Sequence, residues 1–296
     1  MPSARVNGVT LAYETRGDGP PLLFIHGGYG GPSSTHWPGP RLEWLMPAGD
    51  FTTILYDRRC AGDSEYVDRP FTLDDLARDA VALLDHLQLD DALVVGSSAG
   101  GMIALQLALT CPDRVRALAL VNSGAAIMHP NPSRIATPHS PFVRDRLATV
   151  QERIATLDLA EREGARIAVA SRWDEWRSPP PPAAADRYPD QRVALIETLA
   201  TLPDDEIVRL AEGALRNMRA LLHVDLTARL PELRMPVLVV HGDHDTVVPF
   251  EYGRILADAI PQARFVAFPG VGHGMLTLPE VQQVVLDWAR EPQNAG

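Results

Sequence analysis

The sequence predicts a three-layer α/β fold, in which helices cover both faces of a mostly parallel sheet and a helical cap is inserted. In the first half, short apolar runs alternate with helical patterns, which is typical of a parallel sheet buried on both faces. Strand-like runs vanish from Gly124 to about Leu230 and return near the end of the chain. A length of 296 residues also fits one large core with an insertion better than two equal domains.

The expected strands are short apolar runs between turn residues. They are Thr10–Thr15, Pro21–His26, Thr52–Asp57, Ala92–Ser97, Ala117–Ser123, Val237–His241 and Arg264–Phe268. A helix is predicted from Leu73 to Leu87, where apolar residues recur on one face. Asp74 and Asp75 suit the first turn of this helix, because the helix dipole favours negative charge there.

The stretch from Ala92 to Cys111 contains no charged residue and is long enough to resemble a membrane span. A turn of small residues at 96–101 divides it, so we interpret it as a buried strand followed by a buried helix. The N-terminus lacks the apolar segment of a signal peptide. Neither a membrane association nor export is therefore expected.

The region from 124 to 230 is predicted to be a helical cap, inserted between core segments 1–123 and 231–296. It contains proline clusters at Pro130–Pro141 and Pro179–Pro182, and the remainder has the pattern of short amphipathic helices. A disordered linker is the alternative. The region carries more apolar side chains than a linker would need, which favours a packed cap.

The composition excludes several function classes. A formal net charge of −11 at pH 7 opposes binding to a phosphate backbone, so nucleic acid is not an expected partner. The sequence contains no lysine, which excludes both a Schiff-base lysine and a P-loop. Cys60 and Cys111 form neither a disulfide framework nor a CxxC pair, so we expect a reducing cytoplasm.

Ser98 is the candidate nucleophile, at the centre of a Gly-x-Ser-x-Gly pattern over residues 96–100. The pattern lies where an apolar strand passes into a helix of small residues. A sharp turn there requires glycine at Gly96 and Gly100, because side chains would collide with the neighbouring strand and helix. The alternative is a tight turn whose serines have no catalytic role.

A glycine-rich loop follows the strand that ends near His26, and it contains Gly27, Gly28 and Tyr29. Its backbone N–H groups would face the tip of the nucleophile strand, so Gly28 and Ala99 are predicted to form an oxyanion hole. A flexible glycine loop is the alternative. We interpret His26 as a residue that braces the loop rather than as a base.

Two carboxylates follow the strand Val237–His241, and one of them is expected to orient a histidine. Asp245 is favoured because it lies further into the loop, and Asp243 is expected to brace the turn. A metal site built from His241, His244 and the aspartates is the competing hypothesis. No further cluster of ligands supports it, so no metal is expected.

His273 is the candidate general base, in a glycine-rich loop after the last predicted strand. Taken alone, it could equally be a loop histidine with no role. The chain order Ser98, Asp245, His273 is the order of nucleophile, acid and histidine expected of an α/β-hydrolase.

On these motifs the chain resembles the α/β-hydrolase superfamily over residues 6–290. The resemblance implies an eight-stranded sheet, a catalytic triad and a substrate site between core and cap. Residues 57–64 also resemble the Asp-x-Arg-Gly-x-Gly-x-Ser loop of that family, except that Cys60 replaces a glycine. We expect this replacement to alter the turn, and we assign Cys60 no catalytic role.

The loop and cap also resemble those of prolyl iminopeptidases, which carry His-Gly-Gly-Pro-Gly-Gly and a Trp-x-x-Trp-Glu helix. Tyr29 replaces the proline, and Arg177 follows Trp173 and Trp176 where that family has glutamate. An arginine there would repel a free N-terminal ammonium group, and Glu175 is one helical step away. Tyr29, Trp173 and Trp176 are candidates for substrate contact, with ordinary cap packing as the alternative for the tryptophans.

The predicted reaction is the hydrolysis of a carboxylic ester or lactone, as a small-molecule substrate, through an acyl-enzyme intermediate and without a cofactor. An aminopeptidase is the alternative enzyme. Carbon–carbon bond hydrolysis and cofactor-free perhydrolysis would use the same triad and stay open. A receptor that binds a small ligand without turnover is the alternative from another class. The sequence leaves the oligomeric state open.

Overall fold

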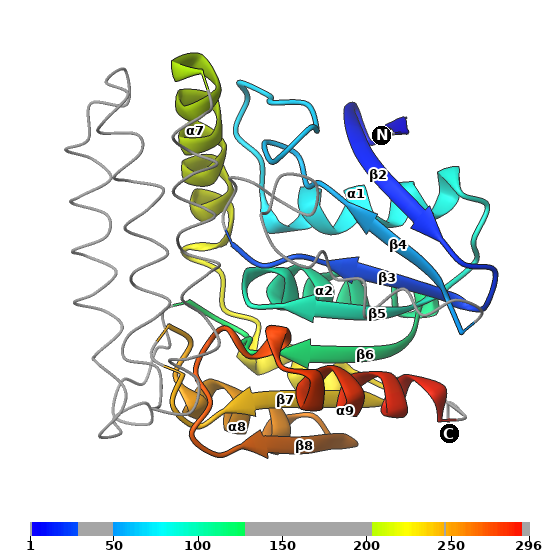
Figure 1. Cartoon of the computed structure of the whole chain (residues 1–296), viewed down its shortest axis with the longest axis vertical. Helices are drawn as coiled ribbons and strands as arrows, with labels where there is room; N and C mark the ends of the chain where they lie inside the picture. The colour runs from blue at the N-terminus through cyan, green and yellow to red at the C-terminus, as the bar shows by residue number, and fades with distance from the viewer. Residues whose placement is uncertain (1, 29–49, 128–202, 246, 292–296) are drawn as a thin grey trace.

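One sheet of eight strands forms the centre of the molecule, in the order β1-β2-β4-β3-β5-β6-β7-β8 (Figure 1). The structure, a computed structural model, describes residues 2–28, 50–127, 203–245 and 247–291. The strands are β1 (Ser3–Val6), β2 (Val9–Arg16), β3 (Pro21–Ile25), β4 (Thr52–Tyr56), β5 (Ala92–Ser97), β6 (Val115–Val121), β7 (Val237–Gly242) and β8 (Ala263–Phe268).

Six of these strands, from β4 across to β8, run parallel, while β2 pairs antiparallel with β4 and β1 antiparallel with β2. The mostly parallel sheet of the predicted α/β fold is therefore confirmed. Parallel strands bring all their carboxyl ends to one edge, which is where sites form in open α/β sheets.

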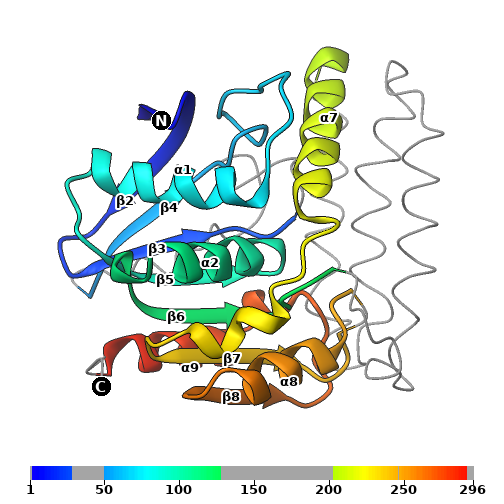
Figure 2. The ribbon, with the colours of Figure 1, turned by 180° about the vertical axis from the view of Figure 1, so that it is seen from behind.

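The helices cover both faces of the sheet, as predicted. They are α1 (Leu73–His86), α2 (Ala99–Thr110), α7 (Asp204–Leu221), α8 (Phe250–Ala259) and α9 (Pro279–Arg290), with short 3₁₀ turns η2 (Pro112–Arg114), η4 (Thr227–Glu232) and η5 (Met275–Thr277). Figures 1 and 2 show α1, α2 and α8 on one face and α9 on the other. The helix α7 stands beyond the carboxyl ends of the parallel strands (Figure 1).

Successive side chains of the central strands enter opposite cores. Leu23 and Ile25 of β3 join the core on the side of α1 and α2, while Leu22 and Phe24 join the core under α9. Both sets are buried, which explains why these strands appear in the sequence as continuous apolar runs.

The uncharged stretch that resembles a membrane span forms β5 and α2, as predicted. Of the twelve residues of α2, nine are buried, because the helix lies between α1 and the sheet. In the part of the chain that the structure describes, no helix combines the length and the apolarity needed to cross a membrane.

The start of α1 is fixed by its own side chains. Thr72 accepts a hydrogen bond from the N–H of Asp75, whose carboxylate accepts one from the Thr72 N–H at 2.9 Å, so the two form a capping box. Asp74 and Asp75 lie in the first turn, as predicted.

The strand β1 is missing from the sequence prediction. It has only four residues at the edge of the sheet, and buried Ala4 and Val6 alternate with exposed neighbours. So short a period-two pattern is difficult to distinguish from a loop. The strand β5 has the predicted bounds, and the other strands differ from prediction by at most two residues at either end. The strand β6 ends at Val121, which leaves Asn122 and Ser123 outside the sheet.

Most of the predicted cap, residues 128–202, lies outside the described residues. The described ends of the 124–230 segment are joined, since Ala126 bridges Asp225 and the Leu226 N–H donates to the Ala125 carbonyl at 2.9 Å. The helix α7 contacts the loop after β4: Asn217 donates to the Arg59 carbonyl at 3.0 Å.

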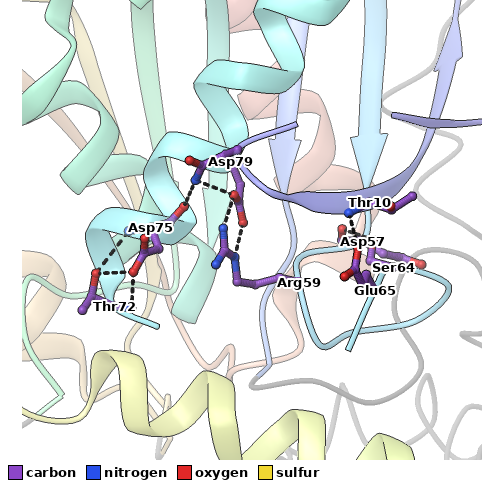
Figure 3. Close-up of polar contacts among 9 residues, drawn as sticks. Thr10, Asp57, Arg59, Ser64, Glu65, Thr72, Asp75 and Asp79 are labelled. Carbon is purple, nitrogen blue, oxygen red and sulfur yellow. Dashed lines mark hydrogen bonds and ion pairs between the residues drawn. The ribbon is translucent and has the colours of Figure 1, made fainter. Parts of the chain in front are cut away.

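The loop after β4 is held by buried charge (Figure 3). Arg59 donates from Nε and Nη2 to the two carboxylate oxygens of Asp79 on α1, at 2.6 and 2.5 Å, and both side chains are 1% exposed. Asn7 also donates to Asp79, at 2.9 Å. Nearby, Glu65 accepts from the Thr10 N–H at 2.8 Å, so β2 holds the far end of the loop.

Because breaking a buried ion pair leaves an uncompensated charge, we predict that Asp79→Ala lowers the free energy of unfolding by about 3–5 kcal/mol. Arg78 of the same helix pairs with Asp74 at the surface, where the side chains are 67% and 37% exposed. Arg78→Ala is therefore the control and should cost under about 1 kcal/mol. Urea denaturation followed by circular dichroism measures both, and equal losses would contradict the assignment of the Asp79 pair as the stronger one.

Candidate active site

Ser98 lies at the sharp turn between β5 and α2, with φ 51° and ψ −122°. This left-handed backbone is strained for a residue with a side chain. A Cβ at Gly100 would lie 2.1 Å from the Ile25 carbonyl oxygen of β3, and one at Gly96 would lie 2.7 Å from Gly101 Cα of α2. The predicted reason for both glycines is thus confirmed.

The turn is also anchored to β6. The Ser98 N–H donates to the Val121 carbonyl at 2.9 Å, and the Ser123 hydroxyl donates to the Ser98 carbonyl at 2.8 Å. A Cβ added at Gly101 would lie 2.1 Å from Ser123 Oγ and so would collide with it. These contacts hold the backbone of Ser98 in its strained conformation.

Three side chains predicted from distant parts of the sequence meet at this turn. His273 Nε2 lies 3.0 Å from Ser98 Oγ, and His273 Nδ1 lies 2.7 Å from Asp245 Oδ2. The Asp245 side chain is fully buried and that of His273 is 6% exposed. Asp245 follows β7 and His273 follows β8, so the carboxyl edge of the parallel strands supplies the whole arrangement.

The structure distinguishes the two candidate carboxylates. Asp245 has one oxygen on His273, while the other accepts from the N–H groups of Val247 and Val248, at 2.9 Å each. Asp243 instead accepts from the Gly270 N–H at 2.6 Å and pairs with its neighbour His244. Asp243 therefore braces the turn, as expected, and Asp245 is the one that contacts the histidine.

Asp245 is held as a carboxylate. Burial alone would raise its pKa, but the adjacent charge of His273 and hydrogen bonds from His241 and His273 hold that pKa well below the usual range. His241 Nε2 lies 3.5 Å from Asp245 and 2.8 Å from the Val248 carbonyl. A charged carboxylate is what fixes the orientation and proton position of the histidine in such a triad.

The glycine loop after β3 packs directly against the turn. A Cβ at Gly27 would lie 3.0 Å from Ser98 Cβ, and Gly28 is buried with a φ of 77°. Ala99 is the first residue of α2, so its N–H has no acceptor within the helix. The two predicted oxyanion donors thus belong to the two backbone segments that flank Ser98.

His26 lies in this loop but away from the triad's hydrogen bonds. Its Nδ1 lies 2.8 Å from the Gly27 carbonyl oxygen, and Arg58 approaches its Nε2 at 3.4 Å. Burial and the positive charge of Arg58 lower the pKa of His26 to about 3, although the bond to Gly27 acts in the opposite direction. These bonds agree with the predicted role of His26 as a brace for the loop.

Two further residues of the site are missing from the sequence prediction. Asn122 donates from Nδ2 to the His273 carbonyl, and Arg58 donates to carbonyls of the glycine loop. Asn122 directly follows β6 in the structure, but the predicted strand Ala117–Ser123 includes it, so the predicted boundary conceals its place at the strand end. Arg58 directly follows the predicted strand Thr52–Asp57, which is a usable signal, because side chains at the carboxyl ends of parallel strands lie near such a site.

The predicted substrate contacts Tyr29, Trp173 and Trp176, together with Arg177, lie outside the described residues.

Cys60 is buried and has a φ of 56°, a backbone conformation that suits the glycine found at this position in the Asp-x-Arg-Gly-x-Gly-x-Ser motif. Residues 2–28, 50–127, 203–245 and 247–291 contain no group of three potential metal ligands.

The low pKa of His26 predicts a specific pH dependence of stability. Between pH 6.5 and 3 the unfolded chain binds a proton at His26 that the folded chain does not, so stability falls as the pH falls. We expect the wild type to lose about 2 kcal/mol more than His26→Gln between pH 6.5 and 5. Urea denaturation at the two pH values measures this, and parallel losses would contradict a neutral His26.

The sequence and the fold are similar to those of known proteins. The sequence matches the α/β hydrolase fold family over residues 20–277. The rhodomycin D methylesterase DnrP of Streptomyces peucetius is 32% identical over 285 residues, which cover 90% of each chain. RutD of Azorhizobium caulinodans, provisionally named a carbamate hydrolase, is 31% identical over 269 residues, which cover 89% of this chain and 88% of that protein.

The fold is also similar to that of solved structures. The enol-lactonase from Burkholderia xenovorans superimposes with a TM-score of 0.76 at 24% identity, covering 98% of this chain and 100% of that one. The family match spans most of the sequence, and the relatives align along nearly their whole length. The chain therefore belongs to the α/β hydrolase fold family.

Proposed function

We propose that the protein is a serine hydrolase that cleaves a carboxylic ester or lactone through an acyl-enzyme intermediate. The observation that carries the proposal is the continuous hydrogen-bonded chain from Asp245 through His273 to Ser98 Oγ. The nucleophile, base and orienting acid of acyl transfer are arranged in this way in otherwise unrelated serine hydrolases.

In the first half of the proposed reaction, Ser98 Oγ attacks the substrate carbonyl carbon while His273 Nε2 takes the hydroxyl proton. The carbonyl oxygen becomes an oxyanion, which the N–H groups of Gly28 and Ala99 stabilise. His273 then gives its proton to the leaving alkoxide as the carbon–oxygen bond breaks. An alcohol leaves, or a ring opens, and the acyl group stays on Ser98.

In the second half, His273 takes a proton from water, and the resulting hydroxide attacks the acyl carbon. The second oxyanion collapses, the bond to Ser98 Oγ breaks and His273 returns the proton to the serine. Asp245 stays ionised throughout, as its lowered pKa requires, and stabilises the imidazolium form of His273 in both halves. The balance needs only ester and water, so no cofactor is invoked.

Ester chemistry is favoured over peptide chemistry by two considerations. A relative at 32% identity is named a methylesterase. Arg177 stands where prolyl iminopeptidases have a glutamate that helps to bind a substrate amine, and a guanidinium would repel that amine. The methylesterase relative and Arg177 both favour a small ester or lactone without a free ammonium group as the substrate class.

The nucleophile assignment predicts covalent labelling. A fluorophosphonate probe should modify Ser98, and peptide mapping by mass spectrometry should locate the adduct there. Ser98→Ala should abolish labelling and lower kcat by at least about 10⁴-fold, because the nucleophile acts as a unit with its base. Labelling elsewhere, or labelling that survives Ser98→Ala, would overturn the mechanism.

The two carboxylates should separate in kinetics. Asp245→Ala should lower kcat by about 10⁴-fold, because His273 loses the group that orients it. Asp243→Ala should keep kcat within about tenfold and lower the free energy of unfolding by about 1–3 kcal/mol, because the Gly270 N–H loses its acceptor. Hydrolysis of p-nitrophenyl acetate and urea denaturation measure the two effects, and the opposite pattern would assign the acid to Asp243.

The substrate class is tested by comparing a p-nitrophenyl acyl ester with an aminoacyl arylamide. We expect kcat/KM for the ester to be at least about 100-fold higher than kcat/KM for the arylamide. Position 177 holds an arginine in place of the glutamate that binds a substrate amine in prolyl iminopeptidases. A preference for the arylamide would support an aminopeptidase instead. One covalent turnover followed by very slow release would support a ligand receptor.

A further inference from the structure

Arg58 is a buried guanidinium whose hydrogen bonds converge on the glycine loop. It directly follows Asp57 after β4 and is 1% exposed. Its Nη2 donates to the Gly28 carbonyl at 2.6 Å and to the Gly27 carbonyl at 3.3 Å. Its Nε approaches His26 Nε2 at 3.4 Å. One side chain therefore contacts three consecutive residues of the loop.

These contacts restrain a backbone segment that contains two consecutive glycines. Two consecutive glycines have few steric limits on their dihedral angles, and Gly28 has a φ of 77°, which residues with a side chain rarely adopt. Hydrogen bonds from a charged donor are stronger than neutral ones. The 2.6 Å bond to Gly28 thus adds a directional restraint to a backbone that has no side chain to limit its dihedral angles.

Peptide geometry connects these carbonyls to the oxyanion hole. In a trans peptide unit the C=O and the following N–H point in opposite directions, and no described peptide bond is cis. Fixing the Gly27 carbonyl therefore fixes the direction of the Gly28 N–H. That carbonyl has two donors, since His26 Nδ1 lies 2.8 Å from it and Arg58 Nη2 lies 3.3 Å from it.

Arg58 also acts on His26. Burial, and after it the positive charge of Arg58, lowers the pKa of the imidazole to about 3, so His26 stays neutral at physiological pH. A neutral imidazole has one donor and one acceptor. With its proton on Nδ1, His26 donates to Gly27 and accepts from Arg58, so the two side chains share one arrangement around the loop.

We propose that Arg58 is a positioning residue for the oxyanion hole, which aims the Gly28 N–H at the reacting carbonyl by holding the carbonyls of Gly27 and Gly28. This inference rests on the proposed serine hydrolase function. Arg58 does not touch the substrate in this account. Its effect appears in the transition state, where the oxyanion has formed, and hardly at all in substrate binding.

The neighbouring arginine offers a matched control. Arg59 is equally buried, but its guanidinium donates to the carboxylate of Asp79 on α1 (Figure 3). A substitution at Arg59 disturbs the same loop and a similar buried charge without touching Gly27 or Gly28. The two arginines therefore separate a general structural effect from an effect on the oxyanion hole.

The experiment compares Arg58→Met with Arg59→Lys. For each variant it measures kcat and KM with p-nitrophenyl acetate, the Ki of a trifluoromethyl ketone and the urea midpoint. The ketone forms a tetrahedral adduct with the serine and so reports on the oxyanion hole. Loss of one oxyanion donor lowers kcat by about 10²–10³-fold, and misplacement of a donor lowers it somewhat less. Arg58→Met should therefore lower kcat by about 10–100-fold.

Three outcomes decide the inference. It is supported if Arg58→Met raises the Ki of the ketone by about the same factor by which it lowers kcat/KM, and keeps KM within threefold of the wild-type value. In the same comparison, Arg59→Lys should change only the urea midpoint. It is overturned if folded Arg58→Met keeps kcat and Ki within threefold of the wild type, or if Arg59→Lys changes both equally. If Arg58→Met does not fold, Arg58→Lys replaces it. The readout is again whether the rise in the ketone Ki matches the fall in kcat/KM.

Failure of the proposed function would appear differently. In that case the wild type itself neither hydrolyses the ester nor forms a fluorophosphonate adduct at Ser98. An active, labelled wild type whose rate does not depend on Arg58 contradicts only the positioning role.

Discussion

The strained backbone at Ser98, with its φ of 51°, is the constraint on which the site depends. It persists because β3, β5 and α2 meet at Gly96 and Gly100, where even one added carbon would overlap backbone atoms. The same close approach places the end of β3, and hence the glycine loop, against the serine. Close packing in the interior resists relaxation and so keeps Ser98 in its strained conformation. The free energy gained by burying the neighbouring strands offsets the strain.

Buried polar groups supply the second level of organisation. Asp245 accepts two backbone N–H bonds through one oxygen and contacts His273 through the other, so its burial is compensated and its charge is retained. Arg59 and Asp79 compensate one another in the loop after β4. Arg58 donates to the carbonyls of the glycine loop. The carboxyl edge of the sheet is thus held by hydrogen bonds with defined directions, which suits a site where donors must point at one atom.

Local patterns predict the parallel strands and α1, because a continuous apolar run and a helical period each lie within one segment. The candidate triad follows from three separate motifs and their order along the chain. The choice of Asp245 over Asp243 depends on which carboxylate reaches another loop, and the sequence only favours it. The edge strand β1 is too short for a periodic signal. Arg58 and Arg59 are adjacent in the sequence but donate to different partners, which only the three-dimensional arrangement reveals. The replacement at Cys60 leaves a left-handed turn, which no pattern of apolar residues reveals.

Family membership by itself leaves the reaction open, because one fold supports many chemistries. The proposed serine hydrolase mechanism therefore depends on a covalent intermediate at one atom, Ser98 Oγ. Its most direct measurement is rapid acid quenching during turnover of p-nitrophenyl acetate, followed by mass spectrometry of the peptide that contains Ser98. The account predicts an acetyl group on Ser98 at early times, formed with a matching burst of p-nitrophenol. Steady hydrolysis without any acyl group on that peptide would contradict it.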